Sequence, residues 1–233
     1  MDLKEAWQIR KRGYEIMAAM RKRDLRNMTH EQWMHSLKVV WSVREPDQKY
    51  FQTALWLQRS LHAADIEFCF IGGLVLQRWG EARQTQDIDL TIFSPLGNEK
   101  ELVKKLTAIL EPRTDDVEGL ATTGRMFVGV APDGIQVDVS LGFMPYEKRL
   151  MERAVDVDFE VAEPLRCCSA EDLAITKTVA GRDQDWADIR RIVHRSGPQV
   201  DWELVYEELK VLLSLSENPE HEERLRQIVK EED

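Results

Sequence analysis

The hydrophobic pattern of this 233-residue chain changes its period twice, and these changes restrict the fold more than any other feature. Up to about His62, apolar residues recur at helical spacings of three, four and seven. Between Glu67 and Ala162, several segments alternate polar and apolar residues, as half-buried strands do. After Pro164 the pattern is helical again. The layout predicts an α+β fold in which helices flank a mixed sheet.

The same pattern predicts three consecutive regions. We expect an N-terminal basic helical segment at 1–46, a sheet domain at 47–165 and a C-terminal helical domain at 166–233. The basic segment either packs against the sheet domain or forms a separate regulatory or partner-binding arm. The expected strands are 68–71, 87–93, 126–130, 135–141 and 155–162, and the expected helices before Pro164 include 49–62, 74–79 and 98–110.

Composition excludes several classes of protein. Apolar residues make up 43% of the chain, which is too many for a disordered protein. The longest uncharged apolar run has nine residues, where a membrane-spanning helix needs about 20, so we expect no membrane association. Three cysteines without CxxC spacing argue against a disulfide framework or a structural zinc site. With a charged N-terminus that does not resemble a signal peptide, these features favour a cytoplasmic protein.

The net charge of −10 is distributed unevenly along the chain. Residues 1–46 carry +4, residues 47–165 carry −8 and residues 166–233 carry −6. A mostly acidic body argues against a dedicated nucleic-acid-binding protein, but it is compatible with chemistry that uses cations. The basic segment is where a contact with RNA or a partner would be expected.

Two aspartates on one expected strand are the strongest candidates for chemistry. Asp87 and Asp89 are two residues apart, so both side chains leave the same face, about 7 Å apart at the backbone. Neighbouring ionised carboxylates repel each other unless a cation lies between them, and oxygen ligands on a rigid strand suit Mg²⁺. Two solvated aspartates on an exposed face are the alternative.

A third carboxylate comes from the expected strand at 135–141. Its alternation places Ile135, Val137 and Val139 on the buried face and Asp138 on the other face. If this strand neighbours the first, Asp87, Asp89 and Asp138 converge, and three carboxylates on a sheet can form a two-metal site for nucleotidyl transfer. An isolated Asp138 on an exposed strand is the alternative.

Residues upstream of these strands suit a phosphate group. Gly72 and Gly73 follow a strand and begin a helix, where free N–H groups attract anions. Arg83 and Thr85 precede Asp87 at spacings that let them reach phosphate oxygens. A plain turn and surface residues are the alternatives.

The segment from Ile71-Gly72-Gly73 through Arg83-Gln84-Thr85-Gln86-Asp87-Ile88-Asp89 resembles the signature of the nucleotidyltransferase (polymerase-beta-like) superfamily. The GG…R-x-T-x-D-h-D form is similar to the AbiEii/MenT-like toxin nucleotidyltransferases of bacterial toxin–antitoxin systems. The later segments 170–177 and 180–189 are similar to that group's later motifs. One departure is Gly73, where much of the wider superfamily has serine.

The resemblance implies a function and roles for residues. The chain would be an Mg²⁺-dependent nucleotidyltransferase with a two-metal site, Mn²⁺ being a second candidate, that consumes a nucleoside triphosphate and releases pyrophosphate. Asp87, Asp89 and Asp138 would hold the metals, and the acceptor would be a tRNA 3′ end or another RNA. An antitoxin protein would be the partner. Nucleotide binding would involve Gly72, Gly73, Arg83, Thr85, Asp172 and Lys177, of which Lys177 would also act in catalysis.

Alternatives remain open at this stage. Asp172 could cap its helix instead of acting in chemistry, and Arg182 could pair with Asp185 or Asp188 across helices. At the level of the whole chain, an acidic body also suits a cationic small-molecule acceptor, as in aminoglycoside nucleotidyltransferases. A non-catalytic binding module with the same fold is the third hypothesis.

Overall fold

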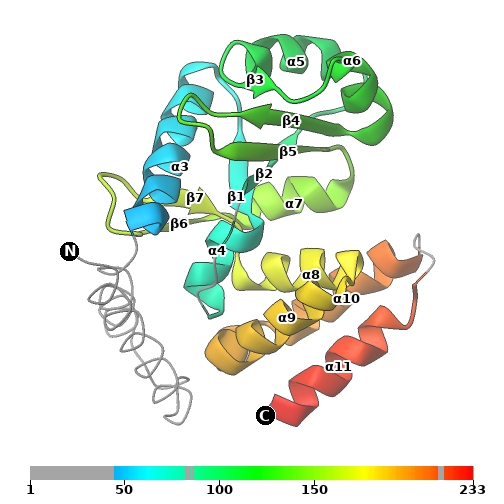
Figure 1. The fold of residues 1–233 in the computed structure, drawn as a ribbon. Coiled ribbons are helices and arrows are strands. Elements are labelled where there is room, and N and C mark those ends of the chain that lie inside the picture. Colours follow the sequence, from blue (N-terminus) through cyan, green and yellow to red (C-terminus); the bar gives the residue numbers. More distant parts are fainter. Residues whose placement is uncertain (1–44, 82–84, 86, 215–217, 233) are drawn as a thin grey trace.

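A mixed sheet lies at the centre of the computed structural model, which describes residues 45–81, 85, 87–214 and 218–232 (Figure 1). Within these residues the sheet has seven strands in the order β3-β4-β5-β2-β1-β7-β6. Pairing is parallel between β2 and β5 and between β1 and β7, and antiparallel elsewhere. The strands are β1 (Phe68–Ile71), β2 (Asp87–Phe93), β3 (Glu111–Pro112), β4 (Met126–Val130), β5 (Gln136–Gly142), β6 (Val155–Val157) and β7 (Leu165–Cys167).

Helices surround this sheet and continue beyond it, as Figure 1 shows. The sheet-associated elements are α3 (Glu45–Ala63), α4 (Gly72–Trp79), α5 (Glu99–Thr107), α6 (Val117–Gly119), the π-helix η2 (Leu120–Gly124) and α7 (Pro145–Arg153). The C-terminal helices are α8 (Ala170–Ala180), α9 (Asp183–Ser196), the short 3₁₀ helix η3 (Gly197–Gln199), α10 (Trp202–Ser214) and α11 (His221–Glu232). The mixed sheet with helices around it confirms the expected α+β class.

Among the described helices, none has the length and apolar character needed to cross a membrane.

Alternation along β2 and β5 determines which face of the sheet is buried. Ile88, Leu90 and Val139 are wholly buried, whereas Asp87 and Asp89, on the opposite face, are half-buried. Each fully buried aliphatic side chain contributes about 1.5–3 kcal/mol, so this apolar face fixes the pairing register of the strands.

Several expected elements are confirmed and others differ. The strands at 68–71, 87–93 and 126–130 have the expected bounds, and β5 begins one residue late at Gln136. The strand expected at 155–162 ends at Val157. The helix expected at 98–110 ends at Thr107 because the next two N–H groups bond three residues back, which tightens the last turn.

Strand β7 lies where the pattern predicts only helix, and it crosses the expected domain boundary between residues 165 and 166. Phe70 pairs with Cys167, so this segment adds to the sheet beside β1. The expected basic segment at 1–46 lies outside the described residues, apart from its last two residues in α3.

The sheet and the C-terminal helices share one continuous core. Buried side chains of the sheet, such as Phe70, belong to the same apolar cluster as Leu173, Ile189 and Leu209 of the helices. The indole of Trp79, at the end of α4, donates to the carbonyl oxygen of Cys168 at 2.9 Å. Ser196 of α9 donates to the carbonyl oxygen of Trp79 at 2.7 Å.

A buried ion network joins α7 to two C-terminal helices. Arg153 donates to both carboxylate oxygens of Asp172 on α8, at 2.6 and 2.9 Å, and to Glu208 on α10 at 3.0 Å. Arg149 donates to Glu208 through two bonds of 2.6 and 2.7 Å. The Asp172 carboxylate is fully buried, so it depends on these partners for its charge.

Removing one partner of the buried pair should cost far more than removing one partner of an exposed pair. We expect Asp172→Ala to lower the free energy of unfolding by about 3 kcal/mol, because the largely buried Arg153 loses two of its charged hydrogen bonds and keeps only Glu208 as a counter-charge. The matched control is Glu163→Ala, whose carboxylate pairs with Arg59 at the surface and should contribute less than about 1 kcal/mol. Urea denaturation of both variants measures the difference, and equal losses would contradict a stabilising role of the network.

Candidate active site

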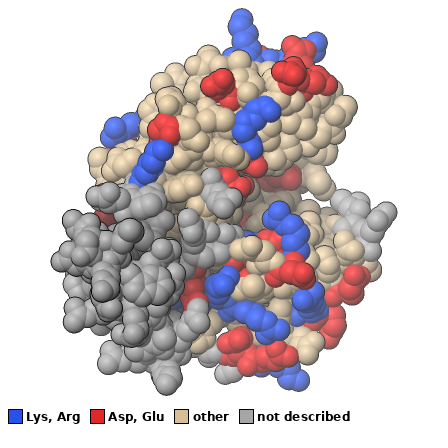
Figure 2. Space-filling model, in the orientation of Figure 1, with Lys and Arg blue, Asp and Glu red and all other residues tan. Residues whose placement is uncertain are grey.

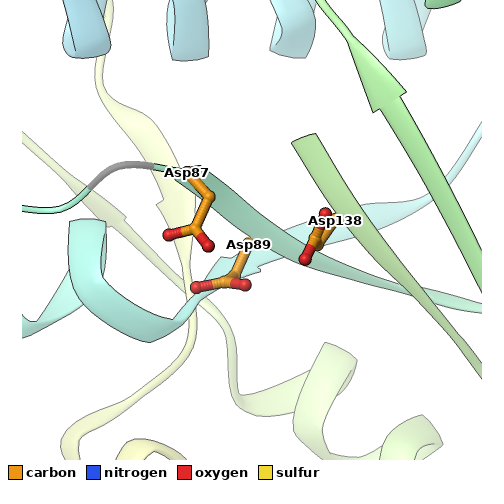
Figure 3. Close-up of side chains that lie close together, drawn as sticks. All are labelled: Asp87, Asp89 and Asp138. Carbon is orange, nitrogen blue, oxygen red and sulfur yellow. The ribbon is translucent and has the colours of Figure 1, made fainter. Parts of the chain in front are cut away.

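Three carboxylates converge on the half-buried face of the sheet (Figure 3). Asp87 and Asp89 project from β2 and Asp138 projects from β5, and one oxygen from each lies within 4.8 Å of the others. Asp89 and Asp138 are direct neighbours across the parallel pair. The convergence follows from the strand register, because the opposite face of both strands is packed into the core.

The site lies on the side of the sheet that faces the C-terminal helices. Figure 2 shows acidic side chains in the recess between the sheet part and the helical part of the molecule. Asp87 lies at the N-terminal end of β2, and Asp138 lies near the same end of β5 because the two strands run parallel.

The three carboxylates repel one another electrostatically, and this repulsion affects the pKa values of two of them. The pKa of Asp89 is raised to about 6, first by burial and then by the charges of Asp87 and Asp138. Burial also raises the pKa of Asp138, against the opposing effect of Arg113. Carboxylates whose pKa values are raised by burial and by one another are typical of a functional site.

The turn between β1 and α4 approaches the cluster closely. Gly72 has φ of +67°, and a Cβ atom placed there would lie 2.1 Å from Oδ2 of Asp89. The Gly73 backbone N–H donates to Asp89 and lowers its pKa. Only glycine at 72 combines this backbone conformation with this contact. The N-terminus of α4 is thus directed at the carboxylates, where its free N–H groups also favour a bound anion.

Thr85 supports Asp87 from the preceding segment. Its hydroxyl group, which is buried, donates to the Asp87 backbone carbonyl at 3.0 Å and lies 3.2 Å from the Asp87 carboxylate. Arg83, the other predicted phosphate contact in this segment, lies outside the described residues.

Lys177 approaches the site from α8. Its ammonium group is buried and lies 2.7 Å from Asp188 and 3.3 Å from Asp185, both on α9. The charge of Lys177 nevertheless reaches Asp89, whose pKa it lowers.

Arg182 is the more exposed cation on this side. It pairs with Asp185, as expected, but the two residues lie three apart at the start of α9, so the contact does not cross between helices. The pKa of Arg182 is raised, first by its hydrogen bond to Asp185 and also by Asp89. Its side chain is 77% exposed, so it is accessible to a ligand in a way that Lys177 is not.

The Asp172 carboxylate bonds to Arg153 and Ser169, and not to the three carboxylates of the cluster. Besides Arg153, its carboxylate bonds to the Ser169 hydroxyl at 3.1 Å, and its N–H donates to the same hydroxyl at 3.2 Å. Ser169 is therefore the helix cap. The contacts that the structure gives Asp172 are those of a buried helix start, and none of them is with the carboxylate cluster.

Arg113 is a site residue that sequence reasoning missed. It follows β3, forms an ion pair with Asp138 and donates to the side-chain oxygen of Gln136 at 2.8 Å. No local motif marks it, because it is 25 residues from its partner and follows a strand of only two residues. Only the sheet order reveals the contact.

The donor set fits a divalent cation. Three half-buried carboxylates within 4.8 Å of one another repel until a positive charge lies between them. All their donor atoms are oxygens on paired strands, which suits Mg²⁺ or Mn²⁺ better than softer metals. Asp87, Asp89 and Asp138 would hold such a group.

Comparison with known proteins identifies the family. The model of the family described as "Nucleotidyl transferase AbiEii toxin, Type IV TA system" matches residues 55–231, which is most of the chain and includes all three carboxylates. No curated protein matches the chain.

Three of the solved structures that match the chain are as follows. An antigenic nucleotidyltransferase-like protein from Paracoccidioides brasiliensis is 16% identical with a TM-score of 0.47, covering 79% of this chain and 93% of that one. JHP933 from Helicobacter pylori is 14% identical with a TM-score of 0.39, covering 79% and 91%. The antibiotic-resistance factor ANT(2'')-Ia is 18% identical with a TM-score of 0.38, covering 78% and 89%. These scores are too low to add to what the family match establishes.

Gly72 offers a sharp test of the site geometry. We expect Gly72→Ala to abolish the rise in melting temperature that Mg²⁺ or Mn²⁺ produces, because the new methyl group displaces the Asp89 carboxylate. Gly134→Ala is the matched control, since Gly134 also has a positive φ of +89° but has open space around its Cα. Both variants share the backbone strain, so loss of the metal response in both would contradict the specific contact.

The raised pKa of Asp89 should make the free energy of unfolding depend on pH. Because the folded state holds this proton more tightly than the unfolded state, stability falls as pH rises from about 4 through 6. In the presence of a chelator at pH 8, Asp89→Asn should therefore raise the free energy of unfolding by on the order of 2 kcal/mol, and this gain should vanish near pH 4. Chemical denaturation at both pH values measures it. Asp156→Asn, at an exposed acid on β6, should change little, and a destabilised Asp89→Asn protein at pH 8 would contradict the repulsion.

Proposed function

This chain belongs to the AbiEii nucleotidyltransferase toxin family, and from that membership we propose that it transfers a nucleoside monophosphate from a nucleoside triphosphate to a tRNA 3′ end with Mg²⁺. The nucleotidyltransferase activity follows from the family. The metal, the nucleotide contacts and the tRNA acceptor are the proposed parts.

The observation that supports the proposal most strongly is the mutual approach of Asp87, Asp89 and Asp138 within 4.8 Å on adjacent strands. Divalent cations at these carboxylates would neutralise the triphosphate and lower the pKa of the attacking hydroxyl. The protein supplies a rigid frame for them, because both strands are fixed by a buried apolar face.

We assign the remaining residues by what they can bind. Gly72 and Gly73 direct the N-terminus of α4 at the triphosphate, and Thr85 orients Asp87. Lys177 balances negative charge beside Asp89 from α8. Asp138 takes the proton of the attacking hydroxyl.

In the proposed reaction, the acceptor hydroxyl oxygen forms a bond with the α-phosphorus. The bond from that phosphorus to the α,β-bridging oxygen breaks, and pyrophosphate leaves opposite the attacking oxygen. The proton of the hydroxyl goes to Asp138. We further propose that the protein acts in the cytoplasm and that an antitoxin counteracts it, in keeping with the family description as part of a toxin–antitoxin system.

Label transfer tests this proposal directly. The protein is incubated with Mg²⁺, total bacterial tRNA and each of the four nucleoside triphosphates labelled at the α-phosphate. We expect label in RNA with one preferred nucleotide, and a fall of at least about 10³-fold in Asp87→Ala and Asp89→Ala, since these residues would hold the metal ions that stabilise charge in the transition state. Asp156→Asn, on the exposed part of β6, should retain activity.

Each other outcome points elsewhere. Label that enters only an added aminoglycoside would replace RNA by a cationic small molecule as the acceptor. Nucleotide binding without transfer to either acceptor would contradict the proposed acceptor, and absence of both binding and transfer would favour a non-catalytic module.

A further inference from the structure

Arg113 extends over the sheet toward the third carboxylate. It follows β3, and its guanidinium group lies across β4 to meet Gln136 and Asp138 on β5. Its backbone N–H donates to the Val128 carbonyl at 2.9 Å, and Val128 is the neighbour of Asp138 across the antiparallel pair. The position of the arginine is therefore fixed by the sheet itself.

The guanidinium group has capacity for a further ligand. Arginine has five N–H groups in a planar fork. In the described part of the chain, one nitrogen of Arg113 contacts Gln136 and another contacts Asp138, and 28% of the side chain is exposed. Such a fork can bind a phosphate group in addition to its protein partners.

Cations lie on both flanks of the three carboxylates. In the sheet order β3-β4-β5-β2-β1, Arg113 belongs to the β3 side of Asp138. Gly72 begins α4 at the end of β1, on the other side, and the charge of Lys177 reaches Asp89 from α8. A triphosphate on the Gly72 flank therefore leaves the Arg113 flank for the other reactant.

In-line attack also requires that the nucleotide's leaving group and the acceptor lie on opposite sides of the reacting phosphorus. The attacking oxygen and the leaving pyrophosphate lie on opposite sides of the α-phosphorus. If pyrophosphate leaves toward the N-terminus of α4, the acceptor hydroxyl approaches beside Asp138, where Arg113 lies.

We propose that Arg113 binds a backbone phosphate of the acceptor and thereby selects a nucleic acid over a cationic small molecule. This inference rests on the proposed nucleotidyl transfer, since it assigns the acceptor side of that same site. A fixed guanidinium group attracts a phosphodiester and repels a polyamine at the same position. Because it also pairs with Asp138, Arg113 is both an acceptor contact and a positioning residue for the carboxylate that takes the proton.

The test compares Arg113→Met with Arg113→Lys and with a matched control. The control is Arg59→Met, which removes an arginine paired with Glu163 on the surface of α3. Steady-state transfer to total tRNA gives KM separately for RNA and for the nucleoside triphosphate. Direct binding of labelled tRNA, without nucleotide and over a range of salt concentrations, gives a second readout that needs no catalysis.

We expect Arg113→Met to raise KM for RNA about tenfold or more, with KM for the nucleotide changed less than about twofold. In direct binding, the slope of log affinity against log salt should fall by about one, as for the loss of one phosphate contact. Arg113→Lys should recover part of the affinity, and Arg59→Met should resemble the wild type.

The outcomes separate this inference from the proposed function. An unchanged KM for RNA, or an equal rise for nucleotide and RNA, overturns the role of Arg113 while transfer by the wild type still stands. A wild-type protein that binds no tRNA overturns the inference whatever its catalytic activity. Wild-type tRNA binding that weakens in Arg113→Met supports it even if label transfer to tRNA fails, in which case only the proposed reaction is lost.

Discussion

The repulsion among three aspartates is the constraint on which the rest of this structure depends. Asp89 and Asp138 are neighbours across β2 and β5, and the pKa of Asp89 is raised to about 6 as a result of burial and of both neighbouring acids. The strands cannot separate to relieve the repulsion, because Ile88, Leu90 and Val137 are completely buried on their other face. A slip of one residue would expose that face and bury the acids. The buried apolar face therefore holds the strands together against the repulsion among the three aspartates. Such a loss of stability at the site is common where a protein is preorganised for a ligand.

The C-terminal helices complete this arrangement. Asp185 and Asp188 on α9 hold the Lys177 ammonium group, whose charge lowers the pKa of Asp89. Arg153, at the end of α7, binds Asp172 at the start of α8 through two hydrogen bonds. Ion pairs with α7 and α9 thus surround the helix that carries the balancing cation.

Much of this could be predicted from the sequence, and the failures have physical causes. Alternation predicted β2 and the buried face of β5, and it predicted that Asp87, Asp89 and Asp138 converge if the two strands are neighbours. The structure pairs β2 with β5 and brings the three carboxylates together. Strands of two or three residues, such as β3 and β7, are too short to produce a periodic signal and form because neighbouring strands offer partners. Arg113 was missed for this reason, and the carboxylates around Lys177 depend on how α8 and α9 cross, which no local pattern encodes.

The distribution of charge makes the local cations more informative than the net charge. A chain of net charge −10 has no overall long-range attraction for nucleic acid, so binding of RNA at the site would depend on local cations. Within the described residues, guanidinium groups occur close to the carboxylates on two sides, Arg113 by direct contact with Asp138 and Arg182 through its electrostatic effect with Asp89. A nucleoside triphosphate and a nucleic-acid acceptor are both anionic, so each could bind one of these two guanidinium groups. A cationic acceptor would leave one of them unused. The acidic surface would then restrict binding to molecules that present a phosphate at the site itself.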